Sequence, residues 1–144
     1  MNAGLHLRPL TADDLPAMTA LDGMCFDAET AYPLDVMADF FLQSRARALG
    51  FFSKSTLAAF ILWAGPEIIT LDVNPHFRRA GLARALMGHA LRGIRGRGYR
   101  HARLQVDQDN EPALALYRSL GFEIARPYRE GGKRRYEMEL IFHP

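Results

Sequence analysis

The sequence predicts one mixed α/β domain, a sandwich of helices around a single central sheet. Runs with the two-residue period of strands alternate with runs that have the 3.6-residue period of helices. Their order is β-α-α-β-β-β-α-β-α-β-β, which is typical of a mixed α/β architecture. The 144 residues have 49% hydrophobic and 24% charged side chains, as ordinary globular proteins do. No repeat, low-complexity tract or linker divides them, so we expect a single domain over residues 1–144.

The first half of the chain is expected to form a strand, two helices and a hairpin. Leu5 to Leu10 alternates apolar and polar residues, as a half-buried strand does. Thr11, followed by two acids, is a typical helix cap, and an apolar stripe at helical spacing continues to Met24. After a loop at 26–33, the expected elements are a helix at about 34–44 and two strands at about 46–52 and 57–64 that pair as a hairpin.

The second half contains the clearest helix of the chain, at 81–95. Its apolar residues recur at i, i+3, i+4, i+7, i+8 and i+11, and glycines follow its end. A shorter helix is expected at about 111–119, and Gly121 marks its end. The remaining elements expected are strands at 67–73, 100–107, 122–126 and 134–142.

Composition excludes several classes of protein. No apolar run approaches the roughly 20 residues that cross a bilayer, and the amino terminus has neither the basic nor the apolar part of a signal peptide. Cys25 is the only cysteine and cannot form an internal disulfide. We therefore expect a cytoplasmic protein that does not bind membranes.

The net charge of +2 hides an uneven distribution. Eight arginines and no acid lie between Val73 and Leu104. A solvated helix face explains part of this run, and a nucleic-acid surface is an alternative. The run lacks interleaved aromatic residues, however, and its best-placed arginines lie where a phosphate group would bind. We therefore expect no nucleic-acid partner.

The stretch from Arg78 to Ala83 predicts a phosphate site. A strand that ends at Val73 is followed by a proline, a short loop with two arginines and a helix. The first backbone N–H groups of a helix have no partner within the helix, and they attract anions. Gly81 places no Cβ in the way of a close approach, although a helix-entry turn is the alternative reason for a glycine there.

Two sequence blocks resemble those of the GCN5-related N-acetyltransferase (GNAT) family. The first is Arg-x-x-Gly-x-Ala at 78–83, which is similar to the family's pyrophosphate-binding signature. The second is Asn-x-x-Ala-x-x-Leu-Tyr-x-x-x-Gly-Phe at 110–122, and it most resembles the branch that acetylates the amino termini of ribosomal proteins and peptides. The resemblance implies the GNAT fold: a mixed central sheet of six to seven strands with about four helices, splayed between the fourth and fifth strands.

The resemblance also implies acetyl-CoA (coenzyme A) as acyl donor, no metal, and a primary amine as acceptor. The amine is expected to be a small molecule or a protein or peptide N-terminus, bound by a monomer or homodimer. On the family pattern, the 78–84 loop holds the pyrophosphate and the strand that ends at Val73 pairs with the pantetheine arm. The residues implied to bind the donor are Leu71, Asp72, Val73, Arg78, Arg79, Ala80, Gly81, Leu82, Ala83, Arg84, Asn110 and Tyr117.

Tyr117 is the residue that the resemblance implies as general acid. A tyrosine with an ordinary pKa of about 10 can donate a proton to a departing thiolate. Tyr117 also lies on the apolar stripe of its helix, so packing against the sheet is the alternative role. Asn110 has two candidate roles as well. It is implied to hydrogen-bond the pantetheine, and before Glu111-Pro112 it is a good helix N-cap.

The general base is less clearly marked. Peptide N-terminal acetyltransferases often have Glu at the position of Gln105, and glutamine cannot accept a proton. Glu67 matches a position where histone-type relatives keep a catalytic Glu, so we expect it to be the base, directly or through a water. An exposed acid at a strand edge is the alternative, and Asp72 and Asp107 are lesser candidates.

The acceptor pocket is expected between the 26–33 loop and the 126–135 hairpin. The basic residues of the hairpin favour an acceptor that carries carboxylates, and Phe26, Tyr32 and Tyr128 are the expected substrate-binding residues. Cys25 is expected to be buried rather than an acyl-carrying nucleophile, because no histidine is placed to activate it. The sequence therefore predicts direct acetyl transfer in a ternary complex. The alternatives are an acyl-CoA-binding sensor without activity and a small basic nucleic-acid-binding protein.

Overall fold

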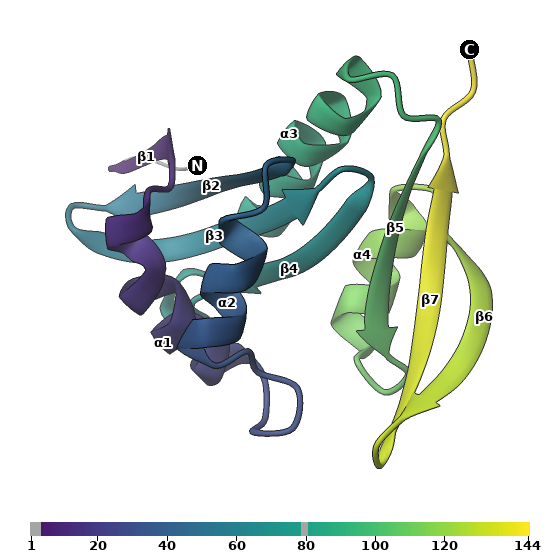
Figure 1. Cartoon of the computed structure of the whole chain (residues 1–144), viewed down its shortest axis with the longest axis horizontal. Coiled ribbons are helices and arrows are strands. Elements are labelled where there is room, and N and C mark those ends of the chain that lie inside the picture. Colours follow the sequence, from purple (N-terminus) through teal and green to yellow (C-terminus); the bar gives the residue numbers. More distant parts are fainter. Residues whose placement is uncertain (1–3, 79–80) are drawn as a thin grey trace.

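The computed structural model describes residues 4–78 and 81–144. In this part of the chain, seven strands form one mixed sheet in the order β1-β2-β3-β4-β5-β7-β6 (Figure 1). The strands are β1 (Leu5–Pro9), β2 (Ala46–Ser53), β3 (Thr56–Ala64), β4 (Glu67–Val73), β5 (His101–Asp107), β6 (Glu123–Glu130) and β7 (Lys133–Ile141). The helices are α1 (Leu15–Cys25), α2 (Leu34–Phe41), α3 (Leu82–Gly96) and α4 (Glu111–Ser119), with 3-10 turns at Ala12–Asp14 and Pro75–Phe77. The predicted fold class and order of elements are confirmed. None of the helices described is long and apolar enough to cross a bilayer.

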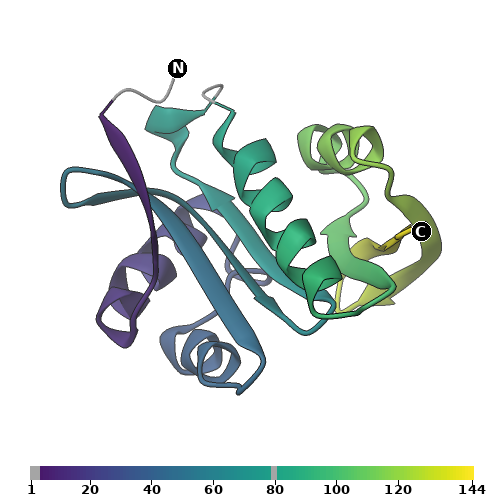
Figure 2. The same ribbon diagram turned by 90° about the horizontal axis from the view of Figure 1, so that it is seen from above.

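The sheet lies between two layers of helices. Figure 2 shows α3 and α4 on one side of it and α1 and α2 on the other. Strands β1 to β4 pair with one another in antiparallel fashion. Almost all of β3 is buried, as its nearly unbroken apolar sequence requires. Helices therefore cover both faces of the amino-terminal half of the sheet.

Two apolar clusters fill the space on the two faces. On the α3 side, Leu86 and Met87 belong to one buried cluster with Ile61 of β3. On the side of α1 and α2, Met18 belongs to a second cluster with Phe60. Phe60 and Ile61 are neighbours in β3, and they face opposite sides because side chains alternate along a strand. This central strand therefore anchors both helical layers.

The sheet is nearly interrupted between β4 and β5. These parallel strands share the register pair Glu67–Arg103, and the Arg103 N–H also donates to the Pro66 carbonyl oxygen at 2.9 Å. Beyond this junction the two strands separate, as Figure 1 shows. The splay predicted between the fourth and fifth strands is confirmed.

A bulge in β4 accompanies the splay. The register of β4 with β3 shifts at Ile69, which is the extra residue. Ile69 and Thr70 consequently both contact the α1 side, whereas Ile68 and Leu71 both belong to the α3 side. The bulge thus decides which side chains of β4 face each helical layer.

The carboxyl-terminal hairpin differs most from the prediction. Strand β6 runs to Glu130 instead of ending near 126, and β7 begins at Lys133, so most of the segment expected between the two strands of the hairpin is itself paired strand. β6 is an edge strand with nearly all its side chains exposed, and it therefore lacks the apolar alternation that reveals other strands. Helix α2 also ends early, at Phe41, because the chain turns where the Ala46 N–H bonds the Gln43 carbonyl.

Leu86→Ala is expected to lower the free energy of unfolding by about 2–5 kcal/mol, because it opens a cavity in the α3 cluster. Leu86 is fully buried, whereas Arg92 is exposed on the same helix. Arg92→Ala is the matched control and is expected to change the unfolding free energy by no more than about 0.5 kcal/mol. Urea unfolding followed by circular dichroism measures both variants, and equal losses would contradict this packing of α3.

Candidate active site

A cleft opens where β4 and β5 separate. Both strands, α4, β7 and the loop between α1 and α2 form its walls, and its cavity volume is about 90 Å³. This is room for several waters or a short chain, since about 10–15 Å³ of such volume admits one water. The residues that line the cleft are Phe26, Thr30, Tyr32, Ile68, Ile69, Thr70, Leu71, Leu104, Gln105, Val106, Asp107, Asn110, Ala113, Tyr117 and Arg135.

Helix α4 brings Asn110, Ala113 and Tyr117 to the cleft, because positions i, i+3 and i+7 share one face of a helix. Tyr117 is 9% exposed, and its ring packs against Phe122 with 5.9 Å between centroids. Burial, followed by the nearby charge of Asp72, raises the pKa of the Tyr117 hydroxyl. Tyr117 therefore packs against the core and also lines the cleft with a hydroxyl that keeps its proton at neutral pH.

Asn110 caps α4. Its Oδ1 accepts the Ala113 N–H at 3.3 Å, which satisfies one of the free donors of the first turn. The same residue lines the cleft. The capping role is therefore observed, and the donor-binding role stays a prediction that the position of Asn110 allows.

Strand β4 supplies the wall on the other side. Leu71 lines the cleft, and Asp72 is fully buried. Because the described register with β5 stops at Glu67, the backbone of Leu71 and Val73 faces no strand on that side. The Val73 carbonyl oxygen accepts a hydrogen bond from the Cys25 thiol at 3.4 Å. The Val73 N–H is then the backbone group of this residue that stays available to a ligand.

The loop before α3 has the conformation that its glycine predicts. Gly81 immediately precedes the helix with φ +73°, in the left-handed region. A Cβ there would meet no atom within 4 Å, so the backbone conformation, and not crowding within the chain, favours glycine. Leu82 is buried and Ala83 half-buried at the start of α3. Arg79 and Ala80, also predicted to bind the donor, lie outside the described residues.

Two of the predicted arginines differ in their surroundings. Arg78 is exposed at the end of the turn that follows β4. Arg84, in the first turn of α3, donates from Nη2 to Ser119 Oγ at 2.9 Å and so links α3 to α4. Arg78 is therefore the freer of the two to reach a phosphate group.

The predicted acceptor residues are only partly brought together. Phe26 and Tyr32 line the cleft, as do residues of α4. Tyr128 does not line it: its hydroxyl is buried without a hydrogen-bond partner among the described residues, and the Arg126 guanidinium lies 4.8 Å from its ring centroid. The loop half of the predicted pocket therefore reaches the cleft, and the tyrosine of the hairpin does not.

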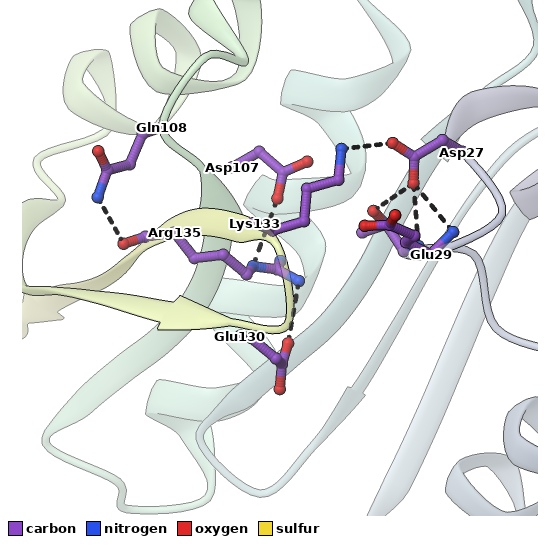
Figure 3. Close-up of polar contacts among 8 residues, drawn as sticks. Asp27, Glu29, Asp107, Gln108, Glu130, Lys133 and Arg135 are labelled. Atoms are coloured by element: carbon purple, nitrogen blue, oxygen red, sulfur yellow. Dashed lines mark hydrogen bonds and ion pairs between the residues drawn. The ribbon is translucent and has the colours of Figure 1, made fainter.

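One ion pair links the α1–α2 loop to the hairpin, and two more lie within the hairpin and between it and β5 (Figure 3). Asp27 pairs with Lys133, which lies 106 residues further along the chain, and this lysine lowers the pKa of Asp27 to about 2. Arg135 lies 3.5 Å from Asp107 and 3.5 Å from Glu130. Both cations are therefore balanced by acids. Their charge alone gives no support to the expectation that the acceptor carries carboxylates.

The candidate bases lie in different places. Glu67 stands at the junction of β4 and β5, 46% exposed, with its Oε1 3.2 Å from Arg103 Nε, and it does not line the cleft. Gln105 and Asp107 of β5 do line it. Among the described lining residues, Asp107 is the one carboxylate. The role of Glu67 stays a prediction, and Asp107 is the alternative that the geometry favours.

The sequence patterns did not reveal a buried polar group beside the cleft. Asp22 of α1 is fully buried and bonds to Thr70 of β4. One signal was visible: Asp22 follows Leu15 and Met18 at helical spacing, on the buried face of α1. An acid at a core position indicates a specific polar partner.

The chain belongs to the acetyltransferase (GNAT) family, because residues 15–122 match the model of this family. That range includes both sequence blocks and the splayed strands on which the resemblance rests. The class of protein implied by the sequence is therefore confirmed.

Individual relatives are similar to parts or all of the chain. A mycothiol acetyltransferase of Thermobifida fusca is 43% identical over 58 residues, which are 40% of this chain and 18% of that protein. The ribosomal-protein-S18-alanine N-acetyltransferase of Escherichia coli is 26% identical, with a TM-score of 0.84 over 97% of this chain and 96% of that one. Ard1 from Thermoplasma volcanium, at 20% identity, has the same fold, with a TM-score of 0.85 over 99% and 100% of the two chains. The chain matches about a fifth of the length of the Thermobifida protein.

Gly81→Ala is expected to lower the free energy of unfolding by roughly 1 kcal/mol, because alanine is strained in the left-handed region. Gly96→Ala, at the last residue of the same helix, is the matched control. Gly96 has no left-handed φ and has space for a Cβ, so alanine there is expected to be neutral or stabilising by up to about 1 kcal/mol. Thermal unfolding compares the two, and a Gly81→Ala protein as stable as wild type would contradict this helix start.

Proposed function

We propose that this protein moves an acetyl group from acetyl-CoA to a primary amine by direct transfer in a ternary complex. The observation that carries the proposal is the cleft between β4 and β5. These strands pair with each other only at Glu67 and Arg103, and the cleft that opens beyond this pair is lined by Tyr117 and Asn110. Membership of the GNAT family supports acetyl-CoA as donor. The acceptor is a protein or peptide N-terminus or a small amine.

The residues present fit a donor that has both amides and a pyrophosphate. The free backbone groups of Leu71 suit an amide of the pantetheine arm, which would add to β4 as a strand does, and the Val73 N–H further along β4 is left for the thioester. The N–H groups at the start of α3, with Arg78 nearby in the chain, suit the pyrophosphate. Asn110 keeps its side-chain NH₂ for the arm, because its cap bond uses only Oδ1. When bound, acetyl-CoA supplies the acetyl group as an activated thioester.

Tyr117 acts as the general acid in this proposal. Its raised pKa keeps the hydroxyl in the acid form but makes it a weaker acid than the ordinary tyrosine assumed from the sequence. It donates its proton to the leaving sulfur only as negative charge develops there. The Val73 N–H stabilises the charge that develops on the thioester oxygen. Both groups come from the walls of the splay, one from α4 and one from β4.

Direct transfer is supported by the state of Cys25. Burial, and next the charge of Asp72, raises the pKa of the Cys25 thiol to about 11. A thiol that stays protonated is a poor nucleophile, and this one also donates to the Val73 carbonyl oxygen. An acyl-enzyme on Cys25 is therefore not part of the proposal.

The acceptor amine must lose a proton before it attacks. Glu67 is the proposed base and would act through a water, because its carboxylate lies outside the cleft and pairs with Arg103. Asp107 is the competing base, since it lines the cleft, although its carboxylate forms an ion pair with Arg135. The kinetic variants below separate the two.

An acyl-CoA sensor without activity is the second candidate function. Gln105 favours it, because this residue lines the cleft where a proton-accepting side chain would suit catalysis. Calorimetry with acetyl-CoA and a thiol-release assay with peptides, polyamines, aminoglycosides and amino acids distinguish the two candidates. Acetyl-CoA binding with thiol release supports the enzyme, binding without release under any acceptor supports the sensor, and no binding removes both.

Tyr117→Phe is expected to lower kcat by about 10²–10⁴-fold, because the departing thiolate loses its proton donor. Binding of acetyl-CoA is expected to change little. Tyr99→Phe is the matched control, since the Tyr99 hydroxyl bonds Arg45 away from the cleft. Steady-state kinetics across pH measures both, and a Tyr117→Phe enzyme that turns over at the wild-type rate would contradict the general-acid role.

Glu67→Gln is expected to lower kcat at neutral pH by about 10²–10⁴-fold, with partial recovery at high pH, where the amine loses its proton to solvent. Asp107→Asn is the comparison variant in the same pH series. A loss confined to Asp107→Asn, with Glu67→Gln unchanged, would move the base to Asp107.

A further inference from the structure

Two carboxyl groups are buried together between α1 and β4, and the proposed transfer uses neither side chain. Asp22 and Asp72 are both 0% exposed. Thr70 lies between them, with its Oγ1 2.5 Å from Asp72 Oδ1 and 3.1 Å from Asp22 Oδ1. No ion pair joins either carboxyl to a cation in the described part of the chain. A buried carboxyl group without a cation must either be neutral or have its negative charge stabilised by hydrogen bonds.

Both contacts with Thr70 can be hydrogen bonds only if one of the two acids is neutral. A threonine hydroxyl carries one proton, so Thr70 can donate to only one of the two carboxyl groups. The other contact is then a hydrogen bond only when its own carboxyl supplies the proton. If both contacts are hydrogen bonds, a proton lies on Asp22 or on Asp72.

The surroundings of the two acids indicate which of them carries the proton. Asp22 Oδ2 accepts the Tyr32 N–H at 2.7 Å, so both of its oxygens accept bonds, an arrangement that suits a carboxylate. Asp72 Oδ2 has no partner among the described residues, so an ionised Asp72 would bury an unpaired charge. Asp72 also makes the shorter contact with Thr70.

We propose that Asp72 is a protonated positioning residue: it donates to Thr70, Thr70 donates to Asp22, and Asp22 holds the backbone of Tyr32. The chain of hydrogen bonds therefore runs from the donor strand β4 to the loop that lines the acceptor side of the cleft. It fixes Tyr32 relative to Leu71 and Val73. Its kinetic consequence rests on the proposed acetyl transfer, whereas the protonation of Asp72 does not.

The other groups around Asp72 are compatible with this assignment. Burial, and then Asp22, raises the pKa of Asp72 well above its ordinary value. The remaining titratable neighbours are Cys25 of α1 and Tyr117 of α4. Burial is the first cause that raises the pKa of each, and ionisation of Asp72 would raise it further. Arg78 acts on Cys25 from further away. Neither the Cys25 thiol nor the Tyr117 hydroxyl therefore changes its charge at neutral pH, where Asp72 is tested.

The pH dependence of stability tests the proton. The folded state keeps a proton on Asp72 that the unfolded chain releases above about pH 4. Wild-type stability should therefore fall as pH rises from about 4 towards the raised pKa, by up to tenfold in the folding equilibrium constant per pH unit. Asp72→Asn removes this proton, so its stability relative to wild type should increase with pH in urea unfolding between pH 4.5 and 8. If the difference in unfolding free energy between Asp72→Asn and the wild type does not change with pH, the assignment is overturned.

Infrared spectroscopy tests the same proton in the wild-type protein and needs no variant to fold. A protonated carboxylic acid has a C=O band separate from those of carboxylates. We expect this band at pH 7, shielded from exchange with solvent. Its absence would overturn the proposal. Both of these measurements stand even when no acceptor amine is found, so they separate this inference from the proposed function.

Thr70→Val tests the positioning role, because valine has nearly the same shape and no hydroxyl. The loss of the link to Tyr32 should raise KM for the acceptor by roughly 5–10-fold, the effect of about one hydrogen bond. The Kd of acetyl-CoA and kcat should change much less. Thr70→Ser keeps the hydroxyl and should restore the acceptor KM. An equal effect of Thr70→Val on both substrates, or no rescue by serine, would indicate general loosening and contradict the role.

Discussion

The separation of β4 from β5 is the constraint on which the rest of the structure depends. A continuous sheet would satisfy the backbone of Leu71 and Val73 and would leave no space for a cleft. A complete break would leave two half-sheets with exposed edges. The junction at Glu67 and Arg103 avoids both outcomes, and α3 packs on β3, β4 and β5 and so spans the gap. The apolar face of this helix is therefore as necessary to the cleft as the residues that line it.

The cleft is assembled from parts that are distant in the sequence. One of its walls comes from the α1–α2 loop, and this loop is held in two ways: by the ion pair of Asp27 with Lys133 at the surface and by the bond of Asp22 to the Tyr32 backbone in the interior. An ion pair between exposed groups is screened by solvent and contributes little. A buried polar link costs more to disrupt, because its groups then lack partners. The interior link is therefore the stronger restraint on the loop.

Much of the fold was predictable because its signals are local. The period of α3, the cap at Asn110 and the apolar sequence of β3 each determine an element without reference to the rest of the chain. Strand β6 was predicted too short because it is an exposed edge strand. The link from Asp22 to Thr70 joins residues 48 apart, and the exclusion of Glu67 from the cleft follows from where the splay begins. Such features depend on tertiary geometry, which periodicity does not encode.

The unpaired edge of β4 beyond Glu67 also has a thermodynamic consequence. A ligand that completes this edge binds the folded chain and not the unfolded one, so it shifts the folding equilibrium by mass action. At a concentration 100 times its Kd it would add about 2.7 kcal/mol to the stability, as much as a buried leucine contributes. Proteases act on the open form, whose population falls with that stability. The resistance of this protein to proteolysis would then increase with the concentration of the ligand that binds along β4.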